Sequence, residues 1–401
     1  MRIKILIILG AIALLTSCKK TIKSSPIVQP PADTTVSLIN TSTIRSDGTI
    51  LVDGTPFFPF GAYSVEWTET NQDRIDCLNE LADAGFNTTS FSDAGPGSIT
   101  PALIQQANDR NIKVFLSAPA SQWIADVALE YKNNKCILAY ILADDGDDGR
   151  TTLQEIITRN SNVKIIDPKH LTFLTLTGYY KVRRDDVNTY SRLPDITGYQ
   201  CYPITPPTDY DVTNSNALTE TYIRTLLYVK SAEIFKKPCL LHLQTFTWQR
   251  SNLSNRRFPT ILELRNMMYS GLCAGVKGIL SYDFSFDLKN NQITLWNEFK
   301  TLRTDVSTLE GALMNGKLIR INTDDQELVC SYWIYNDLCY MVVVNTSYTT
   351  SKNVSIALPA TFTGIKTSLF SRMNNTLTVN GTNLTGSIPP QEVQVFSIAK
   401  L

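Results

Sequence analysis

No excess of charge of either sign marks this sequence, since 37 Lys and Arg residues balance 37 Asp and Glu residues over 401 positions. Chains that bind a phosphate backbone usually carry a basic stripe interleaved with aromatic side chains, and no such stripe is present. Nucleic acid is therefore not an expected partner. Hydrophobic residues make up 43% of the chain, which is ordinary for a globular protein. A length of 401 residues is enough for one large and one small domain.

Cysteine pairs with metal-ligand spacing are also absent. The chain has 8 cysteines, 2 histidines and no Cys-x-x-Cys motif, so neither a zinc site nor a disulfide framework is indicated. The acidic cluster Asp144–Asp148 lacks the ligand spacing of a calcium loop. We therefore expect no metal and no cofactor.

The apolar run at the N-terminus is too short to span a bilayer. Residues 1–4 are basic and 5–15 are apolar, the pattern of a secretory signal peptide. The next residues, Leu-Thr-Ser-Cys ending at Cys18, resemble the lipobox of bacterial lipoproteins. That resemblance implies a signal peptide over 1–18, a lipid anchor at Cys18 and an extracytoplasmic place in the cell envelope, on the outer membrane or its periplasmic face. The alternative is an ordinary signal with a chance cysteine, and in either case 19–43 is expected to be a flexible tether.

Short apolar runs alternate with amphipathic stretches from residue 57 onward. This alternation predicts βαβ units around a parallel sheet, and eight units over about 250 residues match a closed (β/α)8 barrel, or TIM barrel. We therefore expect an α/β barrel domain over 44–310. The eight runs are 57–63, 86–92, 113–117, 137–143, 171–177, 196–202, 239–244 and 278–282.

After Glu310 helical periodicity gives way to alternating runs separated by Asn, Gly and Pro. This pattern predicts a small C-terminal antiparallel β-sandwich over 311–401. A two-residue turn at 336–337 would pair Cys339 with Ile334 and Cys330 with Val343, which keeps the two sulfurs apart. The runs are 328–335, 339–345, 351–358, 365–369, 376–379 and 393–398.

Four carboxylates follow the fourth apolar run directly, at the end of a barrel strand where an active site is expected. Like charges this close have separated pKa values, which suits acid–base work. We favour a site role for Asp144 and Asp145. For Asp147 and Asp148 we favour the alternative that they face the positive end of the helix that begins near Thr151.

The seventh run places His242 and Gln244 toward the barrel interior and Leu241 and Leu243 toward the helices, because side chains alternate along a strand. A neutral amide can bind a hydroxyl group but cannot act as a base or nucleophile. A hydrogen-bonded polar pair in the core is the alternative for Gln244, and His242 reads as a core residue.

Acids and aromatic residues follow several other runs. Aromatic faces beside hydroxyl-binding acids suit sugars, although aromatic side chains also fill barrel ends structurally. Together these residues favour a carbohydrate site, and they are Tyr63, Glu66, Trp67, Asp93, Tyr202, Tyr282, Asp283 and Phe284.

Several of these segments together resemble the barrel-type glycoside hydrolases of the large retaining clan. The resemblance rests on 51–61 (LVDGTPFFPFG), 79–88 (NELADAGFNT), 140–147 (YILADDGD) and 263–279. It covers most of 48–300, and it implies a glycosidase barrel.

In that clan a Glu after the fourth strand is the acid/base, and a Glu after the seventh is the nucleophile. The resemblance assigns Asp145 to the first position, with Gly146 in place of Pro, and Gln244 to the neighbourhood of the second. Gln cannot form the covalent intermediate. Three routes remain: an inverting pair of Asp145 with Asp283 or Glu66, a substrate that supplies its own nucleophile, or binding without cleavage.

The first functional hypothesis is a glycoside hydrolase acting on an extracytoplasmic oligo- or polysaccharide. Asp145 would be the general acid, Asp144 would orient it or bind a hydroxyl group, and Tyr202, Gln244 and Asp283 would hold the sugar. The second is a non-catalytic glycan-binding lipoprotein on a degenerate barrel. A third is a chitinase-like, substrate-assisted hydrolase using 144–148, a cluster that lacks the acidic pattern ending in Glu.

Overall fold

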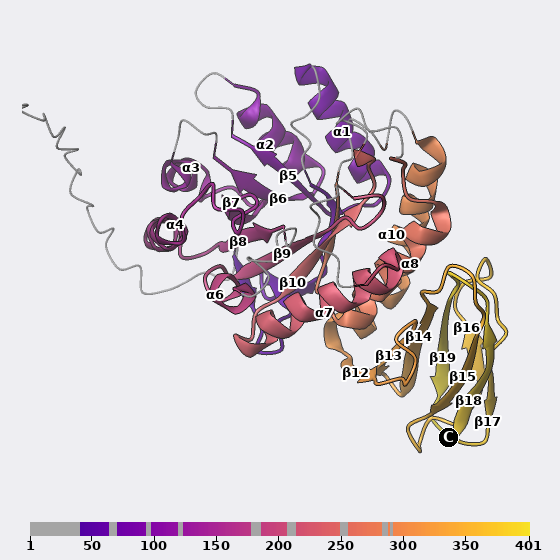
Figure 1. The fold of residues 1–401 in the computed structure, drawn as a ribbon. Helices are drawn as coiled ribbons and strands as arrows, with labels where there is room; N and C mark the ends of the chain where they lie inside the picture. Colours follow the sequence, from indigo (N-terminus) through magenta and orange to yellow (C-terminus); the bar gives the residue numbers. More distant parts are fainter. Residues whose placement is uncertain are drawn as a thin grey trace, which may run out of the picture. The chain divides into compact units, whose positions relative to one another are not determined.

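Eight parallel strands form a closed barrel in the computed structural model, which describes residues 41–63, 70–93, 98–118, 123–177, 186–206, 214–248, 256–282, 288 and 292–401. Each strand pairs with the next along the chain, and the last pairs with the first. Helices lie around the outside (Figure 1). The predicted (β/α)8 architecture is therefore confirmed. The barrel strands are β4 (Phe60–Ala62), β5 (Thr88–Ser92), β6 (Lys113–Ser117), β7 (Ile137–Ala143), β8 (Leu171–Leu176), β9 (Ile196–Cys201), β10 (Cys239–Gln244) and β11 (Ile279–Tyr282).

The helices between these strands begin at side-chain caps encoded locally. The α8 helix starts after Thr260, which forms a capping box with Glu263. At α4 the box is formed by Thr152 and Glu155. The helices are α1 (Asn71–Asp83), α2 (Thr100–Asp109), α3 (Ile124–Tyr131), α4 (Leu153–Ile166), α6 (Val187–Ser191), α7 (Ala217–Ile234), α8 (Ile261–Ala274) and α10 (Ile293–Asn315).

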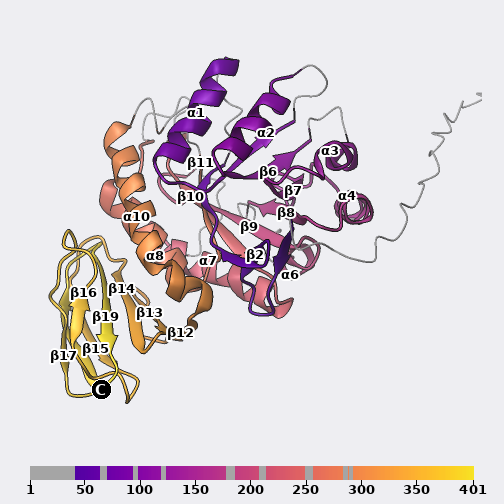
Figure 2. The same cartoon turned by 180° about the vertical axis from the view of Figure 1, so that it is seen from behind.

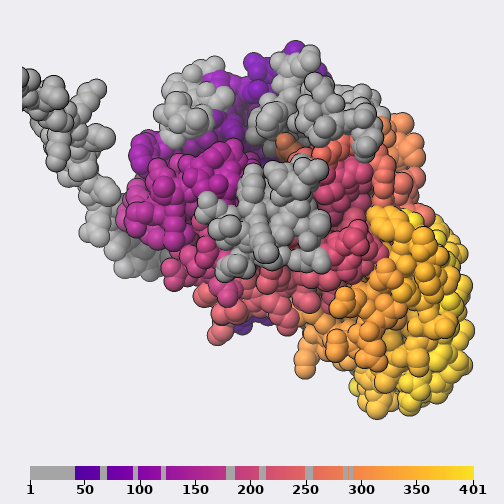
Figure 3. Space-filling model, viewed as in Figure 1, coloured from indigo at the N-terminus to yellow at the C-terminus, as the bar shows by residue number. Residues whose placement is uncertain are grey.

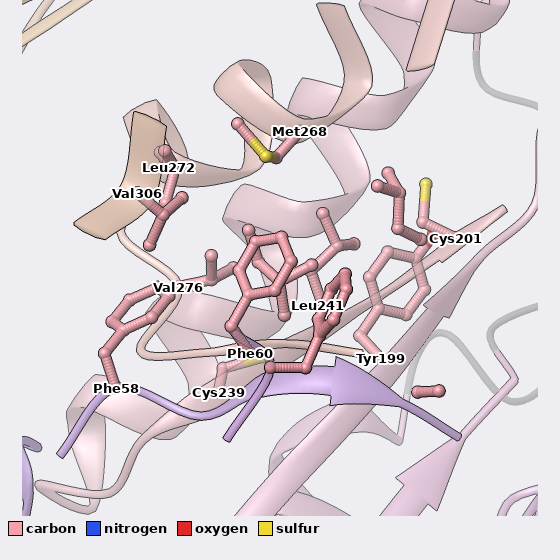
Figure 4. Close-up of a cluster of buried hydrophobic side chains, with 14 of the residues drawn as sticks. Phe58, Phe60, Tyr199, Cys201, Cys239, Leu241, Met268, Leu272, Val276 and Val306 are labelled. Carbon is pink, nitrogen blue, oxygen red and sulfur yellow. The ribbon is translucent and has the colours of Figure 1, made fainter. Parts of the chain in front are cut away.

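Two apolar layers hold the barrel together. Inside it, Phe115, Phe173 and Leu240 are fully buried, so the interior is a packed core, as is usual for this architecture. Outside it, a second layer fills the space between strands and helices. Figure 4 shows part of that outer layer, with Phe60, Tyr199, Leu241, Met268 and Leu272 among its members.

A small antiparallel sheet covers the end of the barrel where the strands begin. It consists of β1 (Ser42–Ile44), β2 (Ile50–Val52) and β3 (Thr55–Phe57), and Figure 2 shows it in indigo. Ser42 Oγ donates to the carbonyl of Leu138 at 2.6 Å and accepts from the Leu171 N–H at 3.1 Å. These residues start β7 and β8, so the barrel is closed at this end and any open mouth is at the opposite one.

A β-sandwich follows the barrel, as predicted. One sheet has the order β12-β13-β14-β19-β16 and the other β15-β18-β17; their residues form a continuous orange-to-yellow region in Figure 3. The turn residues Asn336 and Asp337 both have positive φ, and Cys330 and Cys339 are buried and free, as expected. The strands are β12 (Lys317–Ile321), β13 (Leu328–Tyr335), β14 (Leu338–Asn345), β15 (Lys352–Ala357), β16 (Lys366–Ser368), β17 (Thr378–Asn380), β18 (Asn383–Ile388) and β19 (Val393–Ala399).

Buried charges join the sandwich to helices α8 and α10. Arg372, between β16 and β17, pairs with Glu298 Oε1 at 3.0 Å and also with Asp305. Arg265 donates to the same Glu298 oxygen, and Tyr269 Oη donates to Asp305 at 2.9 Å. Burial, opposed by Arg372, raises the pKa of Asp305 to about 6. This network fixes the sandwich to the outer face of the barrel.

Candidate active site

The strand β7 becomes irregular near its end, just before Asp144 and Asp145, the acidic residues that follow it. All seven of its residues are buried, and its register with β8 shifts between Ile141 and Ala143. Asp145 then adopts a φ of 50°, a left-handed conformation that Asp tolerates better than most residues. Irregularities of this kind re-aim side chains at strand ends, and here both Asp144 and Asp145 approach partners from neighbouring strands.

Three donors converge on one oxygen of Asp144. Its Oδ1 accepts from Tyr63 Oη at 2.8 Å, from Thr175 Oγ1 at 2.7 Å and from Gln200 Nε2 at 3.2 Å. These donors follow β4 or lie on β8 and β9. Side chains from separate strands therefore meet at the carboxyl end of the barrel, which is the mouth opposite the β1–β3 sheet.

Asp145 lies beside this array and remains partly accessible, with its side chain 23% exposed. Its Oδ1 accepts from Gln200 Nε2 at 2.7 Å, and its Oδ2 pairs with Arg150 Nη2 at 2.6 Å. Burial first, and then the negative charge of Asp144, raise the pKa of Asp145 to about 7, while Arg150 and Gln200 oppose the rise. A carboxyl group with this pKa can hold or release a proton near neutral pH.

The two later acids of the cluster have other partners. Asp147 is buried and accepts from the backbone N–H of Thr177 at 2.7 Å and from its hydroxyl at 3.1 Å. Asp148 pairs with Arg150. The cap of α4 is supplied by Thr152 and Glu155, and Asp147 instead holds the end of β8, so the helix-facing interpretation is wrong for Asp147. For Asp148 it stays a prediction.

Aromatic rings line the side of the mouth formed by β9, β10 and β11. Tyr202 stacks on Tyr282 with ring centroids 5.7 Å apart, and it meets Phe246 edge-on at 5.0 Å. Tyr63 lies 6.3 Å from Tyr282. Tyr282 is partly exposed, whereas Tyr202 is buried, and this burial, with neighbouring charges, raises the pKa of the Tyr202 phenol well above its usual value.

Gln244 and His242 point inward from β10, as the strand alternation predicts. The Gln244 amide is fully buried, accepts from the Ile204 N–H at 2.8 Å and donates to the Ile204 carbonyl at 3.1 Å. These contacts support the expected alternative of a hydrogen-bonded core residue and leave its sugar-binding role a prediction. His242 is fully buried against Tyr63, and burial lowers its pKa to about 3, so its ring is neutral.

The other site predictions have different outcomes. Asp93 follows β5 and is buried. The burial of Tyr131 on α3, and then the charge of Asp93, raise the pKa of the Tyr131 phenol, so Asp93 influences a residue of the helical layer. Its role in substrate binding stays a prediction. The remaining residues, among them the two proposed partners of Asp145, lie outside the described residues: Cys18, Glu66, Trp67, Asp283 and Phe284.

Three residues in contact with the acidic pair were not predicted. Gln200 is inward-facing by the same alternation that identifies Gln244, so the pattern could have revealed it. Thr175 faces inward on β8 by the same alternation as Phe173, whereas Arg150 carries no comparable signal because it reaches the site through a contact that depends on the fold. Within the described ranges, no group of three acidic, His or Cys side chains has the arrangement of a metal site.

No protein-family model and no curated protein sequence matches this chain. Several solved structures with a similar fold are glycoside hydrolases. A family 5 glycoside hydrolase from Bacteroides vulgatus has a TM-score of 0.59 at 14% identity, over 92% of this chain and 95% of that one. An Anoxybacillus alpha-amylase has a TM-score of 0.55 at 12% identity, over 82% of this chain and 90% of that one. A family 30 subfamily 8 xylanase from Clostridium acetobutylicum has a TM-score of 0.53 at 14% identity, over 90% of this chain and 100% of that one. The chain thus shares its barrel fold with these glycoside hydrolases.

Proposed function

We propose that this protein is a glycoside hydrolase acting on an extracytoplasmic glycan, with Asp145 as its general acid. The observation that carries the proposal is a partly exposed carboxyl group at the barrel mouth whose pKa is raised to about 7. A general acid must be protonated at working pH and must reach the leaving-group oxygen. An ordinary Asp, with a pKa near 4, would be ionised there.

The neighbours of Asp145 fit the binding of a sugar. In this proposal Asp144, held by Tyr63, contacts a hydroxyl group beside the acid, and the partly exposed Tyr282, backed by the buried Tyr202, forms an apolar platform for a ring face. The catalytic base that activates water is Asp283 or Glu66, as the sequence suggests. The contacts of Gln244 support a structural role for it.

A second candidate function, glycan binding without hydrolysis, is favoured by the end of β10. A retaining glycosidase needs a carboxylate there in the clan that the sequence resembles, and the Gln244 amide instead binds the backbone of the β9–α7 connection. The ion pair between Asp145 and Arg150 also occupies one oxygen of the proposed acid. Both functions place a glycan at the same mouth.

The proposal includes attachment to a membrane through a lipid on Cys18. Its support is the sequence of residues 1–18 alone. Within the described ranges no helix is both long and apolar enough to cross a membrane. Metabolic labelling with a fatty acid tests the anchor: wild type should be labelled and Cys18→Ser should not. An unlabelled wild-type protein would contradict the anchor.

Incubation with a panel of polysaccharides, with reducing ends and binding measured in parallel, tests the function. We expect release of reducing ends by wild type and a loss of at least about 100-fold in Asp145→Asn. Asp109→Asn is the matched control, because Asp109 is an exposed acid on α2 that accepts from one Gln amide. Binding without release, unchanged in Asp145→Asn, establishes the second function instead.

A further inference from the structure

A single neutral side chain, Gln200, bridges the two carboxyl groups at the mouth. Its Nε2 donates to Asp145 Oδ1 at 2.7 Å and to Asp144 Oδ1 at 3.2 Å. Gln200 is 6% exposed, and it reaches across β8 from β9 to the end of β7. An amide NH2 group has two hydrogens, so each carboxyl group can receive one of them.

This arrangement needs a particular backbone. Consecutive residues of an extended strand point to opposite faces of the sheet, so two adjacent aspartates do not ordinarily reach one donor. The left-handed φ of 50° at Asp145 takes the chain out of the extended conformation. Thr175 holds the turn, since its Oγ1 accepts from the Asp145 N–H at 2.9 Å and donates to Asp144 at 2.7 Å.

We propose that Gln200 is a positioning residue that binds Asp144 and Asp145 as a single pair and helps Asp145 give up its proton. Its amide donates to both carboxyl groups without adding a charge, so it favours the ionised form of Asp145 while leaving the repulsion from Asp144 in place. A Lys in this place would pair with both acids and keep both ionised. The inference deepens the proposed function and rests on it, because it assigns a group that helps the general acid Asp145 release its proton.

The other groups around the pair do not provide this bridge. Thr175 binds one carboxyl group and one backbone N–H, and Arg150 binds Asp145 but not Asp144 among the contacts seen. The titratable and charged groups that face or adjoin the pair from the surrounding elements are Tyr63 after β4, Asp148 and Arg150 after β7, His242 on β10, Tyr202 after β9 and Tyr282 on β11.

Removal of the amide should raise the titration midpoint of Asp145. The hydrogen bond from Gln200 favours the ionised form of Asp145, so Gln200→Met, which keeps the length but has no donor, should move the midpoint upward by about one pH unit. Gln105→Met is the matched control, because the Gln105 amide donates at 2.8 Å to the exposed Asp109 alone. It should leave the Asp145 midpoint where it is.

Carboxyl carbon NMR on aspartate-labelled full-length protein measures these midpoints without any substrate. In wild type the side-chain amide signal of Gln200 should titrate with the same midpoint as Asp145, and this response should vanish in Asp145→Asn. An unchanged Asp145 midpoint in folded Gln200→Met overturns the proposal. If that variant does not fold, a Gln200 amide signal that is insensitive to pH in wild type overturns it equally.

The outcome is separable from that of the proposed function. If Gln200 and Asp145 titrate together in a protein that releases no sugar, the positioning role of Gln200 is supported and the hydrolase function is contradicted. If hydrolysis depends on Asp145 but the pH–rate profile of Gln200→Met matches wild type, the hydrolase function is supported and the positioning role of Gln200 is contradicted.

Discussion

The charge on Asp144 can be deleted with little change in shape, and its loss should lower the pKa of Asp145. In Asp144→Asn the amide oxygen can still accept from Tyr63, Thr175 and Gln200, the three donors that Asp144 Oδ1 now binds. What disappears is the negative charge, which after burial is the largest cause of the raised pKa of Asp145. Burial remains, so the pKa should stay above that of an ordinary Asp.

The size of the shift follows from Coulomb's law. Two unit charges about 4 Å apart interact by about 1 kcal/mol in water and by about 4 kcal/mol at an effective dielectric of 20. Because Asp144 is exposed and Asp145 is 23% exposed, solvent screening favours the lower part of this range. A repulsion of about 1.5 kcal/mol corresponds to about one pH unit, which takes the pKa of Asp145 from about 7 to about 6.

The pH dependence of kcat/KM reports this change, since a general acid works only in its protonated form. The alkaline limb of the profile should move toward acid by about one unit in Asp144→Asn and stay in place in Asp109→Asn. Arg150→Ala checks the sign: loss of the cation should move the limb the other way, by less than about half a unit, because Arg150 is 70% exposed and its ion pair is screened. An alkaline limb that does not move in Asp144→Asn, or that moves upward, refutes the reasoning.

Two further predictions concern stability. Arg372→Ala removes the cation shared by Glu298 and Asp305 and should lower the free energy of unfolding by about 2–3 kcal/mol at pH 8, whereas Lys400→Ala, at an exposed ion pair, should cost less than about 1 kcal/mol. The folded pKa of Asp305, about 6, lies above the usual value, so this carboxyl group takes up a proton in the folded protein as pH falls through 6. Protonated Asp305 no longer pairs with a cation, so the loss of stability in the Arg372 variant should shrink below pH 6. A urea titration that shows the same loss at pH 5 and pH 8 contradicts this. Gln244→Glu sets a carboxylate against carbonyl groups that the amide now donates to and should cost on the order of 3 kcal/mol in denaturant titration without creating activity; a stable, more active variant would show that β10 accepts a nucleophile.

The barrel could be predicted because its signals are local. Runs of apolar residues separated by helical periodicity specify strands and helices wherever they lie in space, and the alternation within β10 correctly turns Leu241 and Leu243 toward the helices. The sandwich was expected for the same reason. Strands β12 and β18 were missed because β12 is partly exposed and has no alternation of buried and exposed residues, and β18 contains Gly386 in place of a side chain that would continue the alternation.

The candidate site was predictable only in part. Asp144 and Asp145 could be identified because they follow a buried run, but the three donors to Asp144 come from residues 31 to 81 positions away. The register shift in β7 and the φ of Asp145 decide which way each acid points, and no spacing rule encodes them. Asp147 shows the limit: its sequence neighbours suggest a helix contact, and its actual partner is Thr177 at the end of another strand.

The sheet formed by β1, β2 and β3 has a consequence for access. The chain joins the described body at Thr41 and Ser42, and Ser42 is hydrogen-bonded to the first residues of β7 and β8. The acids follow the far end of β7, about 20 Å away along a strand of this length. The chain therefore enters the described body at the closed end of the barrel, opposite the acids, so a change to the residues before Thr41 is not expected to alter the acidic mouth directly.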